Sequence, residues 1–288
     1  MLADAFAAER LRFFKARGTV FWSLGFVPLV GIIIGLIQGL LIRGLLAKAA
    51  AAGNAAAALT RPPISLLNQA VEAVSGSNFF IVQLFFLIAG SAILAGDYRW
   101  ETWRFLTPRN TRANLLLAKL ATFGLVAFIG LALLALGGMI AALISAALTG
   151  GGVQWAAPDA DPIKPLAGMF VIAWLELMAL GALAAVIAVA TRAGLAALLV
   201  PVGVWIVQGF VVSQVSRGFE NQLSPPLHYL AGFPVLESDV LKGALSPPGM
   251  GVMMPVNWPM ALAFLLIWIV ALTALAVWLF QRQDLTRE

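Results

Sequence analysis

Cysteine is absent from this 288-residue chain, and histidine occurs once, as His228. The absence of thiols excludes a disulfide framework and a cysteine nucleophile. One imidazole without thiolates is too small a ligand set for a dedicated transition-metal site. We therefore expect neither a metal site nor a bound cofactor in the chain itself.

Charged side chains are also scarce. Asp, Glu, Lys and Arg make up 11% of the residues, against about 25% in soluble domains. Hydrophobic residues account for 61%, and the mean hydropathy is +0.96. These values predict an all-α, polytopic membrane protein. The net charge of +5 reflects basic residues at helix ends, so we expect no nucleic-acid partner.

The motifs of several enzyme classes are missing too. The sequence has no Gly-x-x-x-x-Gly-Lys-Ser/Thr loop, so the chain cannot itself cradle the phosphates of ATP. It contains neither Gly-x-Ser-x-Gly nor His-Glu-x-x-His. We therefore expect no enzymatic activity here, and energy for active work must come from a partner or an ion gradient.

What the chain does contain is long apolar runs, and a helix needs about 20 such residues to cross a bilayer. The first run exceeds the apolar core of a signal peptide, about 7–15 residues, so we keep it as a retained span. The six predicted spans are 20–46, 78–96, 117–148, 166–190, 195–213 and 258–280.

The distribution of Lys and Arg orients these spans. Residues 97–114 form a basic connector, which we expect on the cytoplasmic face as a short amphipathic helix with Tyr98, Trp100 and Trp103 at the headgroup level. Both termini then lie in the cytoplasm, and the protein is a multi-pass component of the inner (plasma) membrane. Twelve basic residues fall in inside segments and six in the longer outside segments. The inside set is Arg10, Arg12, Lys15, Arg17, Arg99, Arg104, Arg109, Arg112, Lys119, Arg192, Arg282 and Arg287.

Residues 1–19 precede the first span. At the helical period Leu2, Phe6 and Phe13 fall on one side, which predicts an interfacial helix lying on an anionic leaflet. The alternative is a frayed basic tail. Membrane lipid is the partner that the first interpretation implies.

Two outer segments are expected to contain short helices. Pro62 and Pro63 are predicted to open a helix that lies flat on the outer surface. Residues 214–257 are rich in proline, and their apolar pieces are too short to cross the membrane. We predict surface or re-entrant helices in that extracytoplasmic segment.

Gly31, Gly35 and Gly39 recur at four-residue spacing in the first span. They put a smooth strip on one face of the helix, and such strips let helix backbones approach closely in lipid. Packing within the subunit and packing between subunits both remain open.

The third apolar run, Leu115–Leu148, is longer than a bilayer requires. Its first turn is assigned to the connector, with Lys119 snorkelling to the membrane surface. A tilt, or a kink near Gly137–Gly138, would absorb the remaining length.

Glu176 is the one ionisable residue deep in a predicted span. A carboxylate in hydrocarbon costs roughly 2.5–3.5 kcal/mol on insertion scales, so such residues face a polar cavity or a partner. Two interpretations stand side by side: a functional group on a transport pathway, or a carboxyl that joins helices. In the second, its partner would be Gln38, Gln83 or Gln208.

The connector resembles the segment after the second span in permeases of ABC type-two transporters. The matching residues are 97–104 (Asp-Tyr-Arg-Trp-Glu-Thr-Trp-Arg), 106–112 (Leu-Thr-Pro-Arg-Asn-Thr-Arg) and 115–119 (Leu-Leu-Leu-Ala-Lys). The tail 280–285 (Phe-Gln-Arg-Gln-Asp-Leu) resembles the closing motif of that family. Two positions depart from its pattern, because Glu101 stands where glycine is usual and Pro108 comes one place early.

The resemblance implies a membrane subunit of an ATP-binding-cassette exporter. Two permease copies, identical or related, would form the pathway, and two cytosolic ATPase subunits would bind ATP and Mg²⁺ and drive it. The connector would be a coupling helix in a groove of the ATPase, and the N-terminal helix would be a second contact. The coupling residues are then Arg99, Trp100, Glu101, Thr102, Arg104, Arg109 and Arg112.

The arginines of this set have a second interpretation, as anchors that keep the connector inside. The function likewise has an alternative, an ion-coupled secondary transporter or channel with Glu176 as proton relay. Inverted repeats with broken helices are typical of such transporters, and no convincing internal repeat is found. Spans rich in Leu, Ala, Val and Phe favour an amphiphile, a drug-like molecule or a lipid-linked species over a naked ion as substrate.

Overall fold

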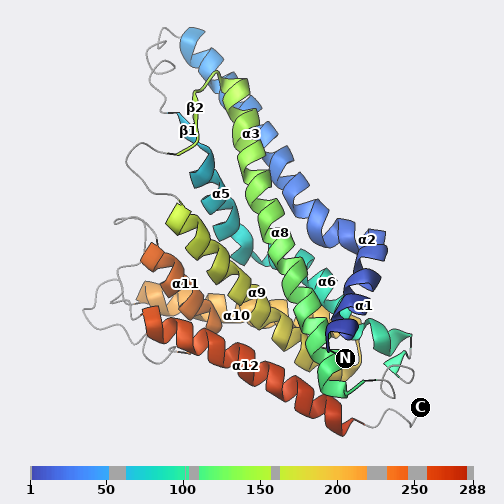
Figure 1. Ribbon diagram of the computed structural model, residues 1–288. Coiled ribbons are helices and arrows are strands. Elements are labelled where there is room, and N and C mark those ends of the chain that lie inside the picture. The colour runs from blue at the N-terminus through green and yellow to red at the C-terminus, as the bar shows by residue number, and fades with distance from the viewer. Residues whose placement is uncertain are drawn as a thin grey trace.

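A computed structural model describes residues 2–51, 63–100, 102–103, 110–156, 163–218, 232–245 and 258–283. Within this part of the chain, six helices are long and apolar enough to cross a membrane, which confirms the all-α, multi-span prediction. Their axes converge at one end, near the N-terminal helix, and spread apart toward the other (Figure 1). We call the converging end the base and the opposite end the far end.

The elements follow one another with short connections. In chain order they are α1 (Leu2–Lys15), α2 (Arg17–Val20), the π-helical turn η1 (Phe21–Gly25), α3 (Phe26–Ala51), β1 (Ile64–Ser65), α5 (Leu66–Ser75), the 3-10 turn η2 (Gly76–Asn78), α6 (Phe80–Arg99), α8 (Arg112–Thr149), β2 (Val153–Gln154), α9 (Ile163–Thr191), α10 (Gly194–Gly218), α11 (Pro234–Leu245) and α12 (Trp258–Arg282).

The helix expected to open at the two prolines begins later. Ile64 and Ser65 instead pair in parallel with Val153 and Gln154, so the backbone is extended there. Helix α5 starts at Leu66. The hydroxyl of Ser65 caps it by accepting a hydrogen bond from the backbone amide of Asn68 at 3.4 Å. The prediction of a helix opened by the prolines is therefore wrong at its start. The helix also packs against α8 and α9 instead of lying apart from the bundle.

Helix α8 is an unbroken helix of 38 residues, about 57 Å long at a rise of about 1.5 Å per residue. It packs along α3, and the two run side by side to the far end (Figure 1). A Cβ atom on Gly35 would lie 2.6 Å from Ala141 Cβ, and one on Gly39 would lie 2.9 Å from Leu148 Cδ1. A Cβ on Gly31 would meet nothing within 4 Å. Two of the three glycines therefore serve packing within the subunit.

Gly137 and Gly138 are contact points of α8. A Cβ on Gly137 would lie 3.1 Å from Pro28 Cβ, and one on Gly138 would lie 2.6 Å from Ala73 Cβ. These glycines let α3 and α5 approach the backbone of α8 from two sides. Helix α8 continues through both residues without a break.

Phe123 marks the centre of the core. Its ring is fully buried where α6, α8 and α9 cross. A Cβ on Gly181 would lie 2.3 Å from this ring, and one on Gly90 would lie 3.2 Å from it. The absence of side chains at both glycines is what allows the three spans to close around one phenylalanine.

Helices α9 and α10 are joined by a tight turn at the base. Arg192 has a positive φ of 56°, and its amide donates to the carbonyl of Ala188 at 2.9 Å. Helix α11 then packs against α9, α10 and α12 and reaches the middle of α9. This helix belongs to the proline-rich segment, and both predicted alternatives, surface and re-entrant, stay open for it.

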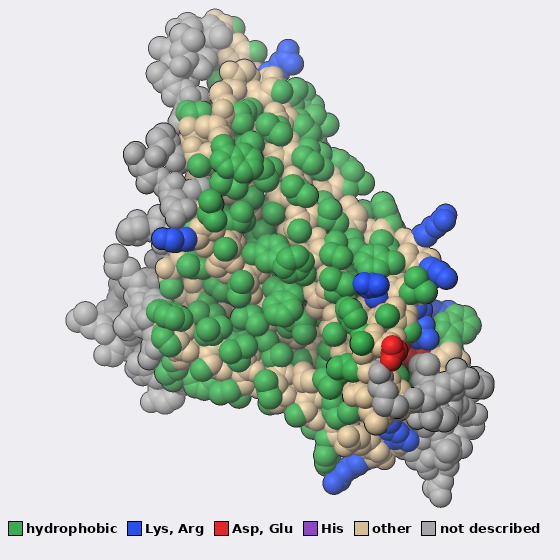
Figure 2. Space-filling model, in the orientation of Figure 1, with side chains coloured by type: hydrophobic (Ala, Val, Ile, Leu, Met, Phe, Trp, Pro, Cys, Tyr) green, Lys and Arg blue, Asp and Glu red, His purple; other side chains and the backbone are tan. Residues whose placement is uncertain are grey.

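Hydrophobic side chains cover most of the face shown in Figure 2, and basic side chains gather mainly toward the base. Large apolar residues are exposed along the whole of α3, from Leu29 at 45% to Leu45 at 66%. Soluble monomers rarely expose a continuous apolar patch of this extent. It is the surface expected of a protein whose sides face lipid.

Candidate functional site

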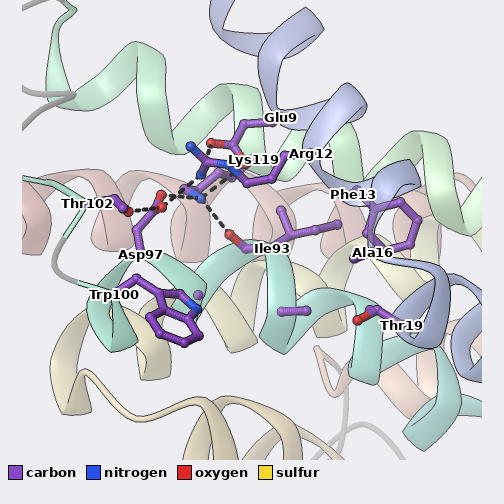
Figure 3. A pocket seen from close by; sticks show the side chains of 12 residues that line it. Glu9, Arg12, Phe13, Ala16, Thr19, Ile93, Asp97, Trp100, Thr102 and Lys119 are labelled. Carbon is purple, nitrogen blue, oxygen red and sulfur yellow. Dashed lines mark hydrogen bonds and ion pairs between the residues drawn. The ribbon is translucent and has the colours of Figure 1, made fainter.

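Two groups of buried charged side chains stand out in this apolar molecule. The junction cluster lies at the base, where α1, α6 and α8 meet, and consists of Glu9, Arg12, Asp97, Thr102 and Lys119 (Figure 3). The mid-span cluster lies near the middle of α9 and consists of Gln83, Glu176 and Lys242.

Lys119 is the centre of the junction cluster. Its side chain is 1% exposed, and its Nζ lies 2.7 Å from Asp97 Oδ2 and 3.3 Å from Glu9 Oε2. The same ammonium group donates to the carbonyl of Ile93 at 2.6 Å. The prediction that Lys119 snorkels to the membrane surface is therefore wrong. Two carboxylates and a helix carbonyl replace its water inside the protein.

Arg12 and Thr102 complete the cluster around Asp97. Arg12 Nη1 donates to Asp97 Oδ1 at 2.8 Å and to Glu9 Oε1 at 3.2 Å. The hydroxyl of Thr102 donates to the same Asp97 oxygen. Asp97 thus joins the N-terminal helix, the last turn of α6, the start of the connector and α8 at one point.

The charges of the junction cluster balance, with two carboxylates facing one guanidinium and one ammonium group. Removing one partner of a buried pair typically costs about 3–5 kcal/mol, because the other charge is left without compensation. The cluster also lines a cavity of about 280 Å³, together with Phe13 and Trp100 (Figure 3). The cluster therefore holds α1, α6 and α8 together next to an open cavity.

The connector residues predicted to reach a partner have different surroundings. Trp100 is 71% exposed, and the guanidinium carbon of Arg99 lies 5.3 Å from its ring centroid. Thr102 belongs to the junction cluster. Glu101, Arg104 and Arg109 lie outside the described residues.

Arg112 is engaged within the protein. Its Nη1 donates to the carbonyls of Phe280, Gln281 and Gln283 at 2.8, 3.2 and 2.6 Å. A cationic side chain at the last carbonyls of a helix is favourable, because these groups have no intrahelical donor. The start of α8 therefore caps the end of α12. The pairing of Arg112 with an acidic partner protein stays a prediction.

Two of the three connector aromatics are internal as well. Trp103 is 2% exposed and packs 4.4 Å from the Phe280 ring, between centroids. The hydroxyl of Tyr98 donates to Gln283 Oε1 at 2.9 Å. Of these three aromatics, only Trp100 is exposed. It alone could lie at the headgroup level as predicted.

Helix α1 packs with a face that the sequence pattern did not identify. Ala5, Glu9 and Phe13 are buried, at spacings of four residues, and α1 packs against α8. Of the residues predicted to face the leaflet, Leu2 is 45% exposed, whereas Phe13 packs inside the protein. The acidic residue hid this face, because a hydrophobic pattern counts Glu9 as a polar position. The i, i+4, i+8 spacing was the available signal.

The mid-span cluster compensates Glu176. The side chain of Glu176 is 2% exposed, and Lys242 Nζ donates to its Oε2 at 2.6 Å. Gln83 Nε2 donates to its Oε1 at 3.2 Å. Of the three predicted amide partners, Gln83 makes the contact, and no hydrogen bond joins Glu176 to Gln38 or Gln208 in the described part. Lys242, from α11, was not anticipated.

A metal site was not expected, and His228 lies outside the described residues. Among the residues that are described, no group of three or more His, Cys, Asp or Glu side chains is arranged to hold a metal ion.

A comparison with protein families gives one match. The family model described as Protein of unknown function (DUF2705) matches residues 35–286. The chain belongs to the DUF2705 family. A comparison with curated proteins gives no match.

The DUF2705 match includes the mid-span cluster and the α6–α8 half of the junction cluster. Asp97, Lys119, Glu176 and Lys242 all fall within residues 35–286. Helix α1, with Glu9 and Arg12, precedes the matched region. The DUF2705 part of the chain therefore supplies the buried Lys119–Asp97 pair, and the N-terminal helix adds a second carboxylate and a guanidinium group to it.

Proposed function

We propose that this protein is the membrane subunit of an ATP-binding-cassette exporter, driven by separate cytosolic ATPase subunits that bind ATP and Mg²⁺. Two copies, identical or related, form the translocation pathway. The base faces the cytoplasm of the cell, and the connector between α6 and α8 is the coupling segment that receives motion from the ATPase.

The observation that carries this proposal is the junction cluster. A coupling segment transmits force only if the helices on both sides of it move as a unit. Asp97 and Lys119 pair at 2.7 Å on the two spans that the connector joins, and Arg12 ties the N-terminal helix to the same carboxylate. A push on the connector or on α1 therefore tilts α6 and α8 together as a rigid body.

The exposed part of the connector supplies a contact surface. Trp100, stacked against Arg99, is the kind of aromatic and cationic pair that is enriched at protein interfaces. Arg10, Lys15 and Arg17 of the N-terminal segment are also exposed at the base. These residues favour an ATPase surface with an acidic rim around an apolar groove.

The alternative function, an ion-coupled transporter with Glu176 as proton relay, needs a carboxyl that exchanges protons freely. The carboxylate is instead held by Lys242 and Gln83, which supports its helix-joining interpretation. Nothing in the described part favours the relay, and the absence of a recognisable repeat weighs in the same direction.

The test starts from the natural membrane. Affinity purification of the tagged chain in mild detergent should co-purify a P-loop ATPase, and the reconstituted complex should hydrolyse ATP. Arg99→Glu together with Trp100→Ala should lower co-purified ATPase at least fivefold, since an aromatic anchor and a cation are both lost. Trp155→Ala is the matched control, because Trp155 is 63% exposed at the far end and should change nothing.

Two outcomes would contradict the proposal. In the first, no ATPase accompanies the parent chain under conditions that preserve its fold. In the second, vesicles containing the chain alone transport substrate on a proton gradient, and Glu176→Gln abolishes that transport. The second outcome would favour the ion-coupled alternative.

A further inference from the structure

A pocket of about 360 Å³ lies beside the mid-span cluster, between the start of α6, the middle of α9, α10 and α11. Three aromatic residues line it, Phe79, Phe80 and Trp205. The carboxyl groups of Glu176 and Asp239 line it as well. The pocket therefore combines aromatic walls with two acidic groups in a part of the molecule otherwise built from apolar side chains.

The charge in this pocket is unbalanced. Lys242 pairs with Glu176 at 2.6 Å, whereas the carboxylate of Asp239 forms no hydrogen bond or ion pair with another described residue. Asp239 is exposed and one helical turn from Lys242 on α11. Among the described residues of this pocket, one ammonium group thus lies near two carboxylates, and that of Asp239 is left available to a cation.

A buried acceptor lies next to the same carboxylate. Gln83 is fully buried, its Nε2 donates to Glu176, and its Oε1 has no hydrogen-bond donor. Buried polar atoms are nearly always paired with a donor. Gln83 does not itself line the pocket, so its oxygen adds to the negative polarity behind Glu176 without contacting a ligand there.

We propose that this pocket binds a lipophilic organic monocation, such as an ammonium or phosphonium ion with apolar substituents. Asp239 supplies the compensating charge, and the rings of Phe79, Phe80 and Trp205 pack on the substituents and attract the cation through their faces. A lipophilic anion of the same shape is excluded, because it would face two carboxylates. Lys242 is a tethered cation already seated at Glu176, and it shows that this site stabilises positive charge.

Helix α11 connects binding to movement of the protein. Lys242 and Asp239 lie on this short helix, while Glu176 lies on α9. A second cation near Asp239 repels the Lys242 ammonium group and weakens the pair that holds α11 to α9. That the bound cation is the exported substrate rests on the proposed export function, whereas the binding itself does not.

The test uses the purified full-length chain in nanodiscs of phosphatidylcholine, without an ATPase. Binding of tetraphenylphosphonium is compared with that of tetraphenylborate, an anion of nearly the same shape, after subtraction of empty nanodiscs. The parent should bind the phosphonium ion at least tenfold more tightly than the borate ion. Asp239→Asn should weaken phosphonium binding about tenfold, the loss expected for one charge in a partly desolvated pocket.

The matched control is Glu72→Gln, which removes an exposed carboxylate of α5 that does not line the pocket. It should bind both probes like the parent. Asp239 is exposed, so Asp239→Asn should leave the thermal unfolding of the protein unchanged, and this measurement excludes a folding defect. Lys242→Met in a properly folded protein should bind the phosphonium ion more tightly, because the competing cation is gone.

Equal binding of the two probes by the parent, or unchanged phosphonium binding by Asp239→Asn, would overturn the proposal. Either result leaves the ATPase partnership untouched, because no ATPase is present in the assay. Conversely, specific phosphonium binding by a chain that recruits no ATPase would uphold the pocket and contradict only the proposed function.

Discussion

Lys119 and Glu176 show at the scale of single residues how charge is accommodated among apolar helices. Each is almost fully buried, and each meets a partner of opposite charge on another helix at 2.7 Å or less. The desolvation cost of such ions is offset by short ion pairs and by additional hydrogen bonds from neighbouring groups. Their pairing also fixes how the helices are rotated against one another, because a displaced helix would leave both charges uncompensated.

The first prediction concerns Lys119. Lys119→Met should lower the free energy of unfolding by about 3–5 kcal/mol, because it leaves two carboxylates facing one guanidinium group. The double variant Lys119→Met with Asp97→Asn should recover more than half of this loss, since it restores charge balance. Unfolding in mixed detergent micelles measures both.

The control for this prediction is Lys15→Met, at an exposed lysine of α1, which should change the unfolding free energy by less than about 0.5 kcal/mol. Losses that simply add in the double variant would show that Lys119 and Asp97 do not interact as the structure indicates.

A second prediction concerns Arg112, whose guanidinium group caps α12. Arg112→Ala should free the last turn of α12 and speed amide hydrogen exchange there by about tenfold or more, since hydrogen bonds from charged groups contribute roughly 1.5–3 kcal/mol. Exchange in the middle of α12 should stay unchanged. The control is Arg17→Ala, at an exposed arginine of α2. If the last turn of α12 exchanged at the same rate in both variants, Arg112 would not cap α12.

At the scale of whole elements, the packing of α3 on α8 depends on where glycines lie. The three glycines of the strip have the same spacing but different neighbours: Gly35 and Gly39 contact α8, whereas Gly31 faces open space. Periodicity identified the strip, and the rotation of α3 against α8 determined which members of the strip are used. Gly31 therefore has no packing role within this subunit.

This difference yields a third prediction with a built-in control. Gly35→Ala should destabilise the protein by about 1–3 kcal/mol, because its Cβ would lie 2.6 Å from Ala141 Cβ and 3.1 Å from Ala141 Cα. Gly31→Ala should be neutral or stabilising by up to about 1 kcal/mol, since alanine is the better helix former. If Gly31→Ala proved the more harmful of the two in the isolated subunit, the observed register of α3 on α8 would be wrong.

At the scale of the whole molecule, the proposed orientation places the N-terminal helix and the end of α12 on one side of the membrane. The helices converge at the base and spread toward the far end (Figure 1). Six helices capable of crossing bring the N-terminal helix and the end of α12 to the same side. The charge distribution then favours the cytoplasm for that side.

The fourth prediction tests this orientation directly. Because the chain has no cysteine, single cysteines can be introduced without removing others. In intact cells a membrane-impermeant maleimide should label Trp155→Cys at the far end and should spare Lys15→Cys at the base until the cells are lysed. The reverse pattern would invert the proposed orientation, and labelling of both in intact cells would contradict a membrane between the two ends.

Much of this architecture follows from the amino-acid sequence alone. The length and apolarity of each run, the scarcity of charge and the clustering of basic residues are local properties, and they predicted six spans, the position of the connector and the short helices between spans five and six. The last predicted span, 258–280, falls within the observed helix α12, Trp258–Arg282. The helix after the two prolines began late because strand pairing with a distant segment intervened.

The partners of the buried charges were decided only by the tertiary structure. Sequence reasoning singled out Glu176 and named Gln83 among its possible partners, but Lys242 is distant in the chain and comes from a helix predicted as a surface or re-entrant element. Glu9 was overlooked, and Lys119 was assigned to the membrane surface, because the contact of α1 with α8 has no local signature. A hydrophobic run specifies that a helix crosses, whereas its rotation, depth and neighbours result from side-chain packing among all the helices at once.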